Sequence, residues 1–220
     1  MYLDALRQSH ILIAGATGSG KSVLLDNLIQ AHFAGLTAGA ALLDPKKVSF
    51  TKWTCDRRVI AHAVNDGAIL ATLRRLAALM DARYDNMMAR GIEKTDAPHV
   101  YIYIDELADL VSAGGEVIQI LTHLLRLGRA AGIHIIAATQ DPSRRTLPAF
   151  IQQNFTAFFA LRCRSAIESK QVIGYPGAEN LPLYGYALYL SPDLYRPEKV
   201  KIDLQTPEQL QAAIYTGRTA

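Results

Sequence analysis

The sequence predicts an α/β fold with a mostly parallel central sheet that carries helices on both faces. Two observations support this prediction. Short apolar runs of strand length recur along the chain, and amphipathic segments of helix length lie between them. The runs are continuously apolar, which is typical of strands buried on both faces of a sheet. Alternating strands and helices are the pattern of a layered α/β sheet.

Seven strands are expected, one at each apolar run. They cover residues 10–15, 39–44, 100–105, 133–139, 156–161, 186–190 and 199–204. The clearest helix is expected over residues 66–90, where large side chains recur every three or four positions. Those side chains are Ile69, Leu73, Leu76, Met80, Tyr84 and Met87. A last helix is expected to begin near Thr206, with Pro207 at its first position.

The composition indicates one globular domain over residues 1–220. The formal net charge of +3 permits binding to nucleic acid without requiring it. The two cysteines, Cys55 and Cys163, form no spacing typical of a zinc site or a disulfide framework, so a cytoplasmic location is expected. No apolar run reaches the about 18 residues of a membrane span, so membrane association is expected only through a partner protein.

A phosphate-binding loop is expected at "GATGSGKS", which fits the pattern GxxxxGK[ST] between an apolar strand and an amphipathic segment. Glycines in such a loop let backbone N–H groups surround phosphate oxygens at a helix N-terminus. Lys21 is expected to reach the terminal phosphates of ATP, and the Ser22 hydroxyl to hold Mg²⁺. The expected nucleotide contacts are Gly15, Ala16, Thr17, Gly18, Ser19, Gly20, Lys21, Ser22 and Val23.

Polar residues that follow two other predicted strands are candidates for the chemistry. Asp105 and Glu106 stand at the carboxyl end of the strand 100–105, the edge where open α/β sheets bind ligands. Asp105 is expected to assist Mg²⁺ and Glu106 to polarise the attacking water; the alternative is that one acid only caps the next helix. Gln140 follows the strand 133–139 and is expected to sense or orient the γ-phosphate or the water; its alternative is a solvated loop amide.

Four arginines are candidates for contacts with other molecules. On a helical projection of residues 117–131, Arg126 lies opposite the apolar face and Arg129 lies on its flank. One of them is expected to complete the ATP site of a neighbouring subunit; the alternative is ordinary exposed charge. Arg144 and Arg145 lie in a proline-bounded loop and are candidates for contacts with DNA phosphates.

Six segments, taken together and in this order, resemble the FtsK/SpoIIIE family of motor proteins. They are "HILIAGATGSGKS", "LLDPKK", "MDARYDNMMARGI", "YIYIDELADL", "RAAGIHIIAATQDPS" and "GAENLPLYGYALY". The resemblance covers nearly the whole chain and extends beyond the general ATPase motifs. It implies a RecA-like P-loop NTPase core that uses ATP and Mg²⁺. It also implies assembly into a ring, usually hexameric, that moves double-stranded DNA through a central channel.

The chain departs from the family's pattern in four respects. Asp141 stands in "ATQDP" where the family has an arginine, and "GYALY" lacks an acid that the family carries. After "DELADL", where relatives often have lysines, the chain reads "VSAGGEV", which predicts a weakened or absent DNA-facing loop. The chain starts nine residues before its first predicted strand, which predicts a bare motor core.

Together these features predict an ATP-hydrolysing motor that translocates double-stranded DNA as a ring oligomer, for a mobile element, a plasmid or a phage. One alternative is a secretion-type ATPase of the same family that moves protein cargo, although such relatives usually carry several ATPase cores in one chain. The other is a nucleotide-gated binding module with little turnover, which the altered "ATQDP" and "GYALY" favour and the intact Lys21, Asp105 and Glu106 oppose.

Overall fold

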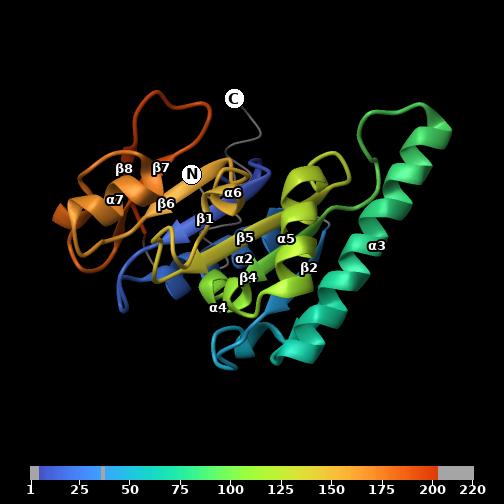
Figure 1. The fold of residues 1–220 in the computed structure, drawn as a ribbon, viewed down its shortest axis with the longest axis horizontal. Helices are drawn as coiled ribbons and strands as arrows, with labels where there is room; N and C mark the ends of the chain where they lie inside the picture. Colours follow the sequence, from blue (N-terminus) through green and yellow to red (C-terminus); the bar gives the residue numbers. More distant parts are fainter. Residues whose placement is uncertain (1–4, 36–37, 203–220) are drawn as a thin grey trace.

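The computed structural model of the protein describes residues 5–35 and 38–202, and one eight-stranded sheet organises this part of the chain (Figure 1). The strand order is β3-β2-β4-β5-β1-β6-β7-β8. The strands are β1 (His10–Ala14), β2 (Gly39–Leu43), β3 (Val59–Ala63), β4 (Val100–Ile104), β5 (Ile133–Thr139), β6 (Ala157–Ala160), β7 (Tyr186–Leu190) and β8 (Glu198–Lys201). The first six strands in the chain are mutually parallel, and β7 and β8 join antiparallel. The predicted mostly parallel sheet is confirmed.

Helices cover both faces of the sheet, as predicted. They are α2 (Lys21–Gly35), α3 (Asp66–Arg90), α4 (Leu107–Ser112), α5 (Gly115–Leu127), α6 (Ala149–Gln152) and α7 (Ala166–Ile173), with short 3₁₀ turns η1 (Thr51–Trp53) and η2 (Ala178–Asn180). Apolar residues of α2 form one core with one face of the sheet, and those of α3, α4, α5 and α6 form a second core with the other. In Figure 1, α2 lies behind the sheet and α3 and α5 lie in front of it.

The continuously apolar strands serve both cores at once. In β1, Ile11 and Ile13 face the α2 side and Leu12 faces the α3 and α5 side, because successive strand residues point to opposite faces. Every residue of β1, β4 and β5 is buried, which confirms the expectation for these strands. The same expectation was wrong for β7, which is buried only at alternate positions, and for β8, which is largely exposed. Both lie at the antiparallel end of the sheet, where fewer neighbours cover them.

The long helix is confirmed at its predicted bounds. The Asn65 side chain caps α3 by accepting from Ala68 N at 2.9 Å, and Gly91 ends the helix at φ 65°. Five of the six predicted core residues are buried. The sixth, Tyr84, is half-buried and donates from its hydroxyl to the carbonyl of Leu127 at 2.8 Å. The periodicity of the sequence therefore identified the packed face.

One strand was missed by the sequence-based expectation, and one connection is unusually short. The edge strand β3 is absent from the sequence-based expectation, because its burial alternates and a histidine, His62, interrupts its apolar run. Between α4 and α5, Gly114 and Gly115 take positive φ angles of 67° and 51°, so α5 begins after a very short turn.

The helix expected near Thr206 lies outside the described residues. In the described ranges, no helix is long and apolar enough to span a membrane.

The single tryptophan of the sequence is attached to α2. Trp53 donates from Nε1 to Asp26 Oδ1 at 2.9 Å, and its ring meets the Phe33 ring edge-on with centroids 5.7 Å apart. Lys52 pairs with the other oxygen of Asp26 at 2.8 Å. This arrangement ties the segment after β2 to the helix that follows the phosphate-binding loop.

Three histidines are buried away from that loop. His10 Nδ1, at the start of β1, accepts from Ile135 N at 3.0 Å, and His32 Nδ1 lies 3.1 Å from the Tyr103 hydroxyl. Burial lowers the pKa of His10 to about 3 and the pKa values of His32 and His134 to about 4. All three side chains are therefore neutral in the folded protein at neutral pH.

Candidate nucleotide site

The carboxyl ends of four adjacent parallel strands carry the candidate site. β1 ends at the phosphate-binding loop, β5 at Gln140, β4 at Asp105 and Glu106, and β2 at Asp44. In the sheet, β5 lies between β1 and β4. Gln140 is therefore placed between the phosphate-binding loop and the two acids, and all of these groups share the edge where open α/β sheets bind ligands.

Backbone geometry makes the predicted loop a phosphate cradle. Gly18 and Gly20 take positive φ angles of 75° and 100°, which residues with a Cβ rarely adopt. At Gly15 a Cβ atom would lie 2.8 Å from Leu161 Cβ and 2.8 Å from Ser19 Oγ, so only glycine fits there. The loop opens onto the first turn of α2, which contains no acidic residue. The N–H groups of this turn lack intrahelical acceptors and favour an anion.

Two side chains of the loop are poised toward its interior. Lys21 Nζ donates to the carbonyls of Gly15 and Ala16 at 2.8 and 3.0 Å. Burial lowers the pKa of Lys21 to about 8; the Glu106 carboxylate opposes this shift, and the Lys46 ammonium adds to it. The Ser19 hydroxyl is buried and finds no hydrogen-bond partner among the described residues. A buried hydroxyl without a partner and a desolvated ammonium in the same loop fit a polyanionic ligand such as a nucleoside triphosphate.

Glu106 is a buried carboxylate held from two sides. Both of its oxygens accept from the backbone N–H of Gln140, at 3.1 and 3.3 Å, and Lys46 Nζ lies 3.0 Å from Oε2. Glu106 occupies the N-cap position of α4, but its side chain makes no capping hydrogen bond. The alternative of a helix cap therefore does not describe Glu106. Asp105 is also buried, and burial raises its pKa. A hydrogen bond from Ser49 and the charge of Lys46 act in the opposite direction without reversing this shift.

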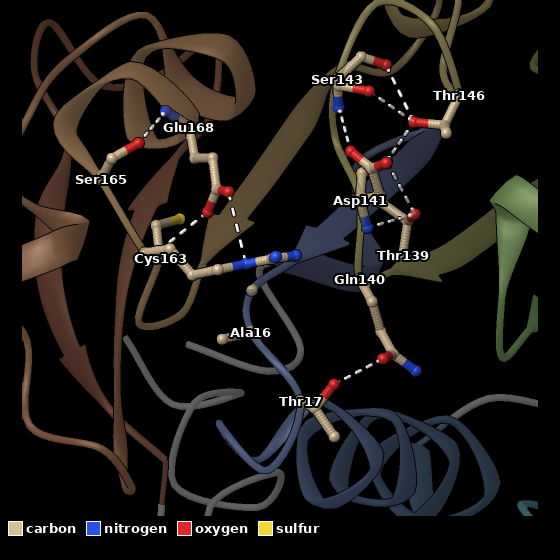
Figure 2. A network of polar contacts seen from close by, with 12 residues as sticks. Ala16, Thr17, Thr139, Gln140, Asp141, Ser143, Thr146, Cys163, Ser165 and Glu168 are labelled. Carbon is tan, nitrogen blue, oxygen red and sulfur yellow. Dashed lines mark hydrogen bonds and ion pairs between the residues drawn. The ribbon is translucent and has the colours of Figure 1, made fainter.

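Gln140 contacts the phosphate-binding loop directly. Thr17 Oγ1 donates to Gln140 Oε1 at 2.7 Å, and Figure 2 shows these two side chains pointing toward one another. The Gln140 backbone binds Glu106, so one residue joins the loop to the acid. The Gln140 side chain is partly exposed and bonded to the loop, and its role toward the γ-phosphate or the water stays a prediction.

Asp141, which replaces an arginine of the family pattern, organises the loop after β5 (Figure 2). Its Oδ1 accepts from Ser143 N at 2.9 Å, and its carbonyl accepts from Thr146 Oγ1 at 2.8 Å. Arg144 and Arg145 lie within this turn and are exposed. Their exposure is compatible with phosphate contacts, and the acid beneath them fixes the loop on which they stand.

The candidate arginines Arg126 and Arg129 do not join the nucleotide site of their own chain. Arg126 is exposed in the last turn of α5. Arg129 is exposed in the turn that follows the helix, which ends at Leu127 and not at residue 131, and Gly132 N donates to the Arg129 carbonyl at 3.3 Å directly before β5 begins. They therefore lie at the amino edge of the sheet, opposite the phosphate-binding loop. The apolar face of the helix was predicted correctly, with Val117, Leu121 and Leu124 buried.

Two residues of the site were absent from the sequence-based expectation. Asp44 is fully buried after β2, accepts from Ser49 N at 2.9 Å, and leaves its other oxygen without a partner among the described residues. Lys46, two positions later, pairs with Glu106. The sequence signal for Asp44 was its position directly after an apolar strand, the same signal that identified Asp105.

The residues predicted to hold Mg²⁺ supply donors of the appropriate kind. Ser22 stands exposed on the first turn of α2, and Asp105 stands at the end of β4. A hydroxyl and a carboxylate suit Mg²⁺, which usually takes one or two protein ligands and leaves its other positions to phosphate and water. The described residues contain no group of three His, Cys, Asp or Glu side chains able to hold a metal by themselves.

The sequence is similar to those of proteins named DNA translocase FtsK. The sequence model of the FtsK/SpoIIIE family matches residues 1–102. The DNA translocase FtsK of Sporosarcina ureae is 29% identical over 238 residues, an alignment that covers 97% of this chain and 30% of that protein. The chain thus spans under a third of the length of this relative.

Solved structures share the fold. The pCW3 conjugation coupling protein TcpA, a monomer with ATPγS, superimposes with a TM-score of 0.77 at 21% identity, covering 96% of this chain and 65% of that one. The cytoplasmic domain of the type VII secretion ATPase EccC of Thermomonospora curvata gives a TM-score of 0.72 at 22% identity, covering 94% of this chain and 28% of that one. At these identities the likeness establishes the fold, a P-loop ATPase core, as predicted.

Proposed function

Because the chain belongs to the FtsK/SpoIIIE family, we propose that it is the ATPase core of a motor that translocates double-stranded DNA. The observation that carries this proposal is the hydrogen-bonded path from Thr17 through Gln140 to Glu106, which links a phosphate cradle to a candidate base. A phosphate-binding protein without turnover has no need of a buried acid in that position.

Each side chain of the site has a defined role in the proposed reaction. The loop N–H groups and Lys21 bind the phosphates of ATP. Glu106 accepts a proton from the water whose oxygen attacks the γ-phosphorus, as the bond to the β-phosphate oxygen breaks and ADP leaves. Gln140 couples the presence of the γ-phosphate to the position of Glu106, because its side chain contacts the phosphate-binding loop and its backbone N–H binds the carboxylate. Mg²⁺, held by Ser22 and Asp105, would neutralise charge on the phosphate oxygens.

The proposed motor acts as a hexameric ring, to which residues 1–220 contribute one ATPase domain per subunit. The placement of Arg126 and Arg129 supports this part of the proposal, because they lie at the edge of the sheet remote from their own ATP site. In a head-to-tail ring that edge is available to the next subunit. One of these arginines then stabilises the charge that develops on the transferred phosphoryl group.

DNA is the proposed cargo, and Arg144 and Arg145 are its proposed contacts in this chain. They stand exposed on one turn, and contacts of this kind bind phosphates without reading sequence. The relative from Sporosarcina ureae is named a DNA translocase. We also propose that the protein works in the cytoplasm and associates with a membrane only through a partner protein.

The deciding experiment is ATP hydrolysis with and without long double-stranded DNA, at low and moderate salt, with Lys21→Ala as the blank. Hydrolysis is expected to rise with DNA, and the rise is expected to shrink as salt increases, because phosphate contacts release counterions. ATP hydrolysis that does not change when DNA is added would favour protein cargo instead of DNA. Nucleotide binding without turnover would identify a nucleotide-gated binding module.

A further inference from the structure

Lys46 takes no part in the reaction proposed above, although it is bound to the residue that accepts the proton. Its Nζ lies 3.0 Å from Oε2 of Glu106. Lys46 belongs to the loop after β2, and β2 pairs with β4, the strand that ends beside Glu106. The two side chains thus meet across neighbouring strand ends although 60 positions separate them in the sequence.

The loop that carries Lys46 is a tight turn with its own hydrogen bonds. Asp44 accepts from Lys47 N through its carbonyl at 3.1 Å and from Ser49 N through its carboxylate at 2.9 Å. Lys47 adopts φ 65°, a left-handed conformation that residues other than glycine rarely take. Phe50 is buried and anchors the end of the turn. With the backbone fixed in this way, movement of the Lys46 side chain alone decides whether the pair with Glu106 exists.

The two partners of the pair differ in their access to solvent. The Glu106 side chain is 5% exposed, whereas that of Lys46 is 33% exposed. Lys47 and Val48, which follow Lys46, are exposed as well. An anion that arrives from solvent can therefore reach the Lys46 ammonium, while the carboxylate remains out of its reach.

We propose that Lys46 is a positioning residue that restrains Glu106, and that a phosphodiester of double-stranded DNA releases the restraint. The DNA part of this inference rests on the function proposed above. Lys46 binds Oε2, and the Gln140 N–H group bridges both oxygens. In this proposal Oε2 is the oxygen that accepts the proton of the attacking water, so Lys46 and the water compete for it. A DNA phosphate that binds the ammonium draws Lys46 away and opens Oε2 to the water. ATP turnover is thereby kept low until cargo is present.

The test measures kcat and KM for ATP with the full chain, without DNA and with saturating long double-stranded DNA. Lys46→Gln is expected to raise the DNA-free kcat about fivefold, the change that loss of one partly exposed ion pair gives. KM for ATP should stay the same, and the stimulation by DNA should fall by the same factor. Lys46→Arg should restore the wild-type values, because it restores the pair. The matched control Lys47→Gln should leave the DNA-free kcat unchanged.

A DNA-free kcat of Lys46→Gln at or below the wild-type value overturns the restraint. If Lys46→Gln has a raised DNA-free kcat and DNA still stimulates it by the same factor as the wild type, release by DNA is overturned. Thermal melting checks that each variant is folded, and Lys46→Met, which keeps the aliphatic stem, repeats the measurement if Lys46→Gln melts early. If DNA fails to stimulate the wild type, the proposed cargo is wrong, and the DNA-free kcat of Lys46→Gln still decides the restraint.

Discussion

The backbone N–H of Gln140 donates to both carboxylate oxygens of Glu106, at 3.1 and 3.3 Å. The Gln140 side chain accepts from Thr17 of the phosphate-binding loop at 2.7 Å. A single residue therefore contacts the phosphate cradle with its side chain and the candidate base with its main chain. We expect a displacement of the loop on nucleotide exchange to reach Glu106 through this one residue.

Replacement of Glu106 by glutamine is expected to lower kcat about 10²- to 10⁴-fold, because the amide keeps the shape of the side chain but accepts no proton. Affinity for ATP should persist, since the phosphates are bound elsewhere. Steady-state hydrolysis and binding of a fluorescent ATP analogue provide the two measurements. Asp109→Asn is the matched control, because Asp109 is an exposed acid on the adjacent helix α4. Unchanged turnover in Glu106→Gln would revive the binding-module alternative.

Replacement of Gln140 by alanine is expected to lower kcat about tenfold while KM for ATP changes little. The substitution removes the contact with Thr17 but retains the backbone N–H that binds Glu106. Gln153→Ala, at an exposed glutamine of the same region, should leave both parameters unchanged. An equal loss in KM and none in kcat would assign Gln140 to nucleotide binding instead.

Gly15→Ala is expected to destabilise the protein by about 1–3 kcal/mol and to weaken ATP binding, because the added methyl group overlaps Leu161 and Ser19. Gly67→Ala is the control, since a Cβ there meets only Asn65 Oδ1 at 3.6 Å. This control should be neutral or stabilising by about 0.4–1 kcal/mol. Chemical denaturation measures both variants. Equal stability of the two would show that the loop relaxes freely around a methyl group.

Stability is expected to fall below pH about 6.5 because of the buried histidines. Burial lowers the pKa of His10 to about 3 and those of His32 and His134 to about 4, from an ordinary value of 6.5. Between these values the unfolded chain binds protons that the folded chain does not, so stability decreases as pH decreases. At pH 5 the loss is about 1–2 kcal/mol for each histidine.

Melting curves between pH 7.5 and 5 test this effect. The double variant His32→Phe, Tyr103→Phe removes one buried imidazole together with its hydroxyl partner, so the hydroxyl is not left buried alone. It should lose less stability on acidification than the wild type. Tyr103→Phe alone should keep the wild-type pH dependence. Parallel curves for all three proteins would exclude His32 as a source of the acid sensitivity.

The proposed arginine donors can be tested by mixing subunits. Arg126→Ala, Arg129→Ala subunits should lose about 10³-fold in kcat, while retaining an intact phosphate site. Lys21→Ala subunits have the complementary defect. Mixed in equal amounts, the two should hydrolyse ATP well above the sum of their separate rates, because some interfaces combine an intact site with intact arginines. Arg75→Ala, at an exposed arginine of α3, is the control. A mixture no more active than its parts would place the donor elsewhere.

Local signals made most of the fold predictable. The strands of both cores and the helix α3 follow from apolar runs and periodicity, and the phosphate-binding loop follows from eight consecutive residues. The edge strand β3 escaped because one of its faces is exposed and its pattern is weak. The pair between Lys46 and Glu106 depends on β2 lying beside β4, and strand order is a property of the folded sheet that periodicity does not contain.

The attachment of Trp53 to Asp26 gives the protein an optical reporter of its own. No other indole is present in the chain, so fluorescence excited at the red edge of the protein absorption comes from this one ring. Its N–H group is bound to the helix that begins at Lys21, directly after the predicted phosphate-binding loop. If that helix moves during nucleotide exchange, the polarity around the indole is expected to change. We expect the emission of Trp53 to follow nucleotide binding without a chemical label.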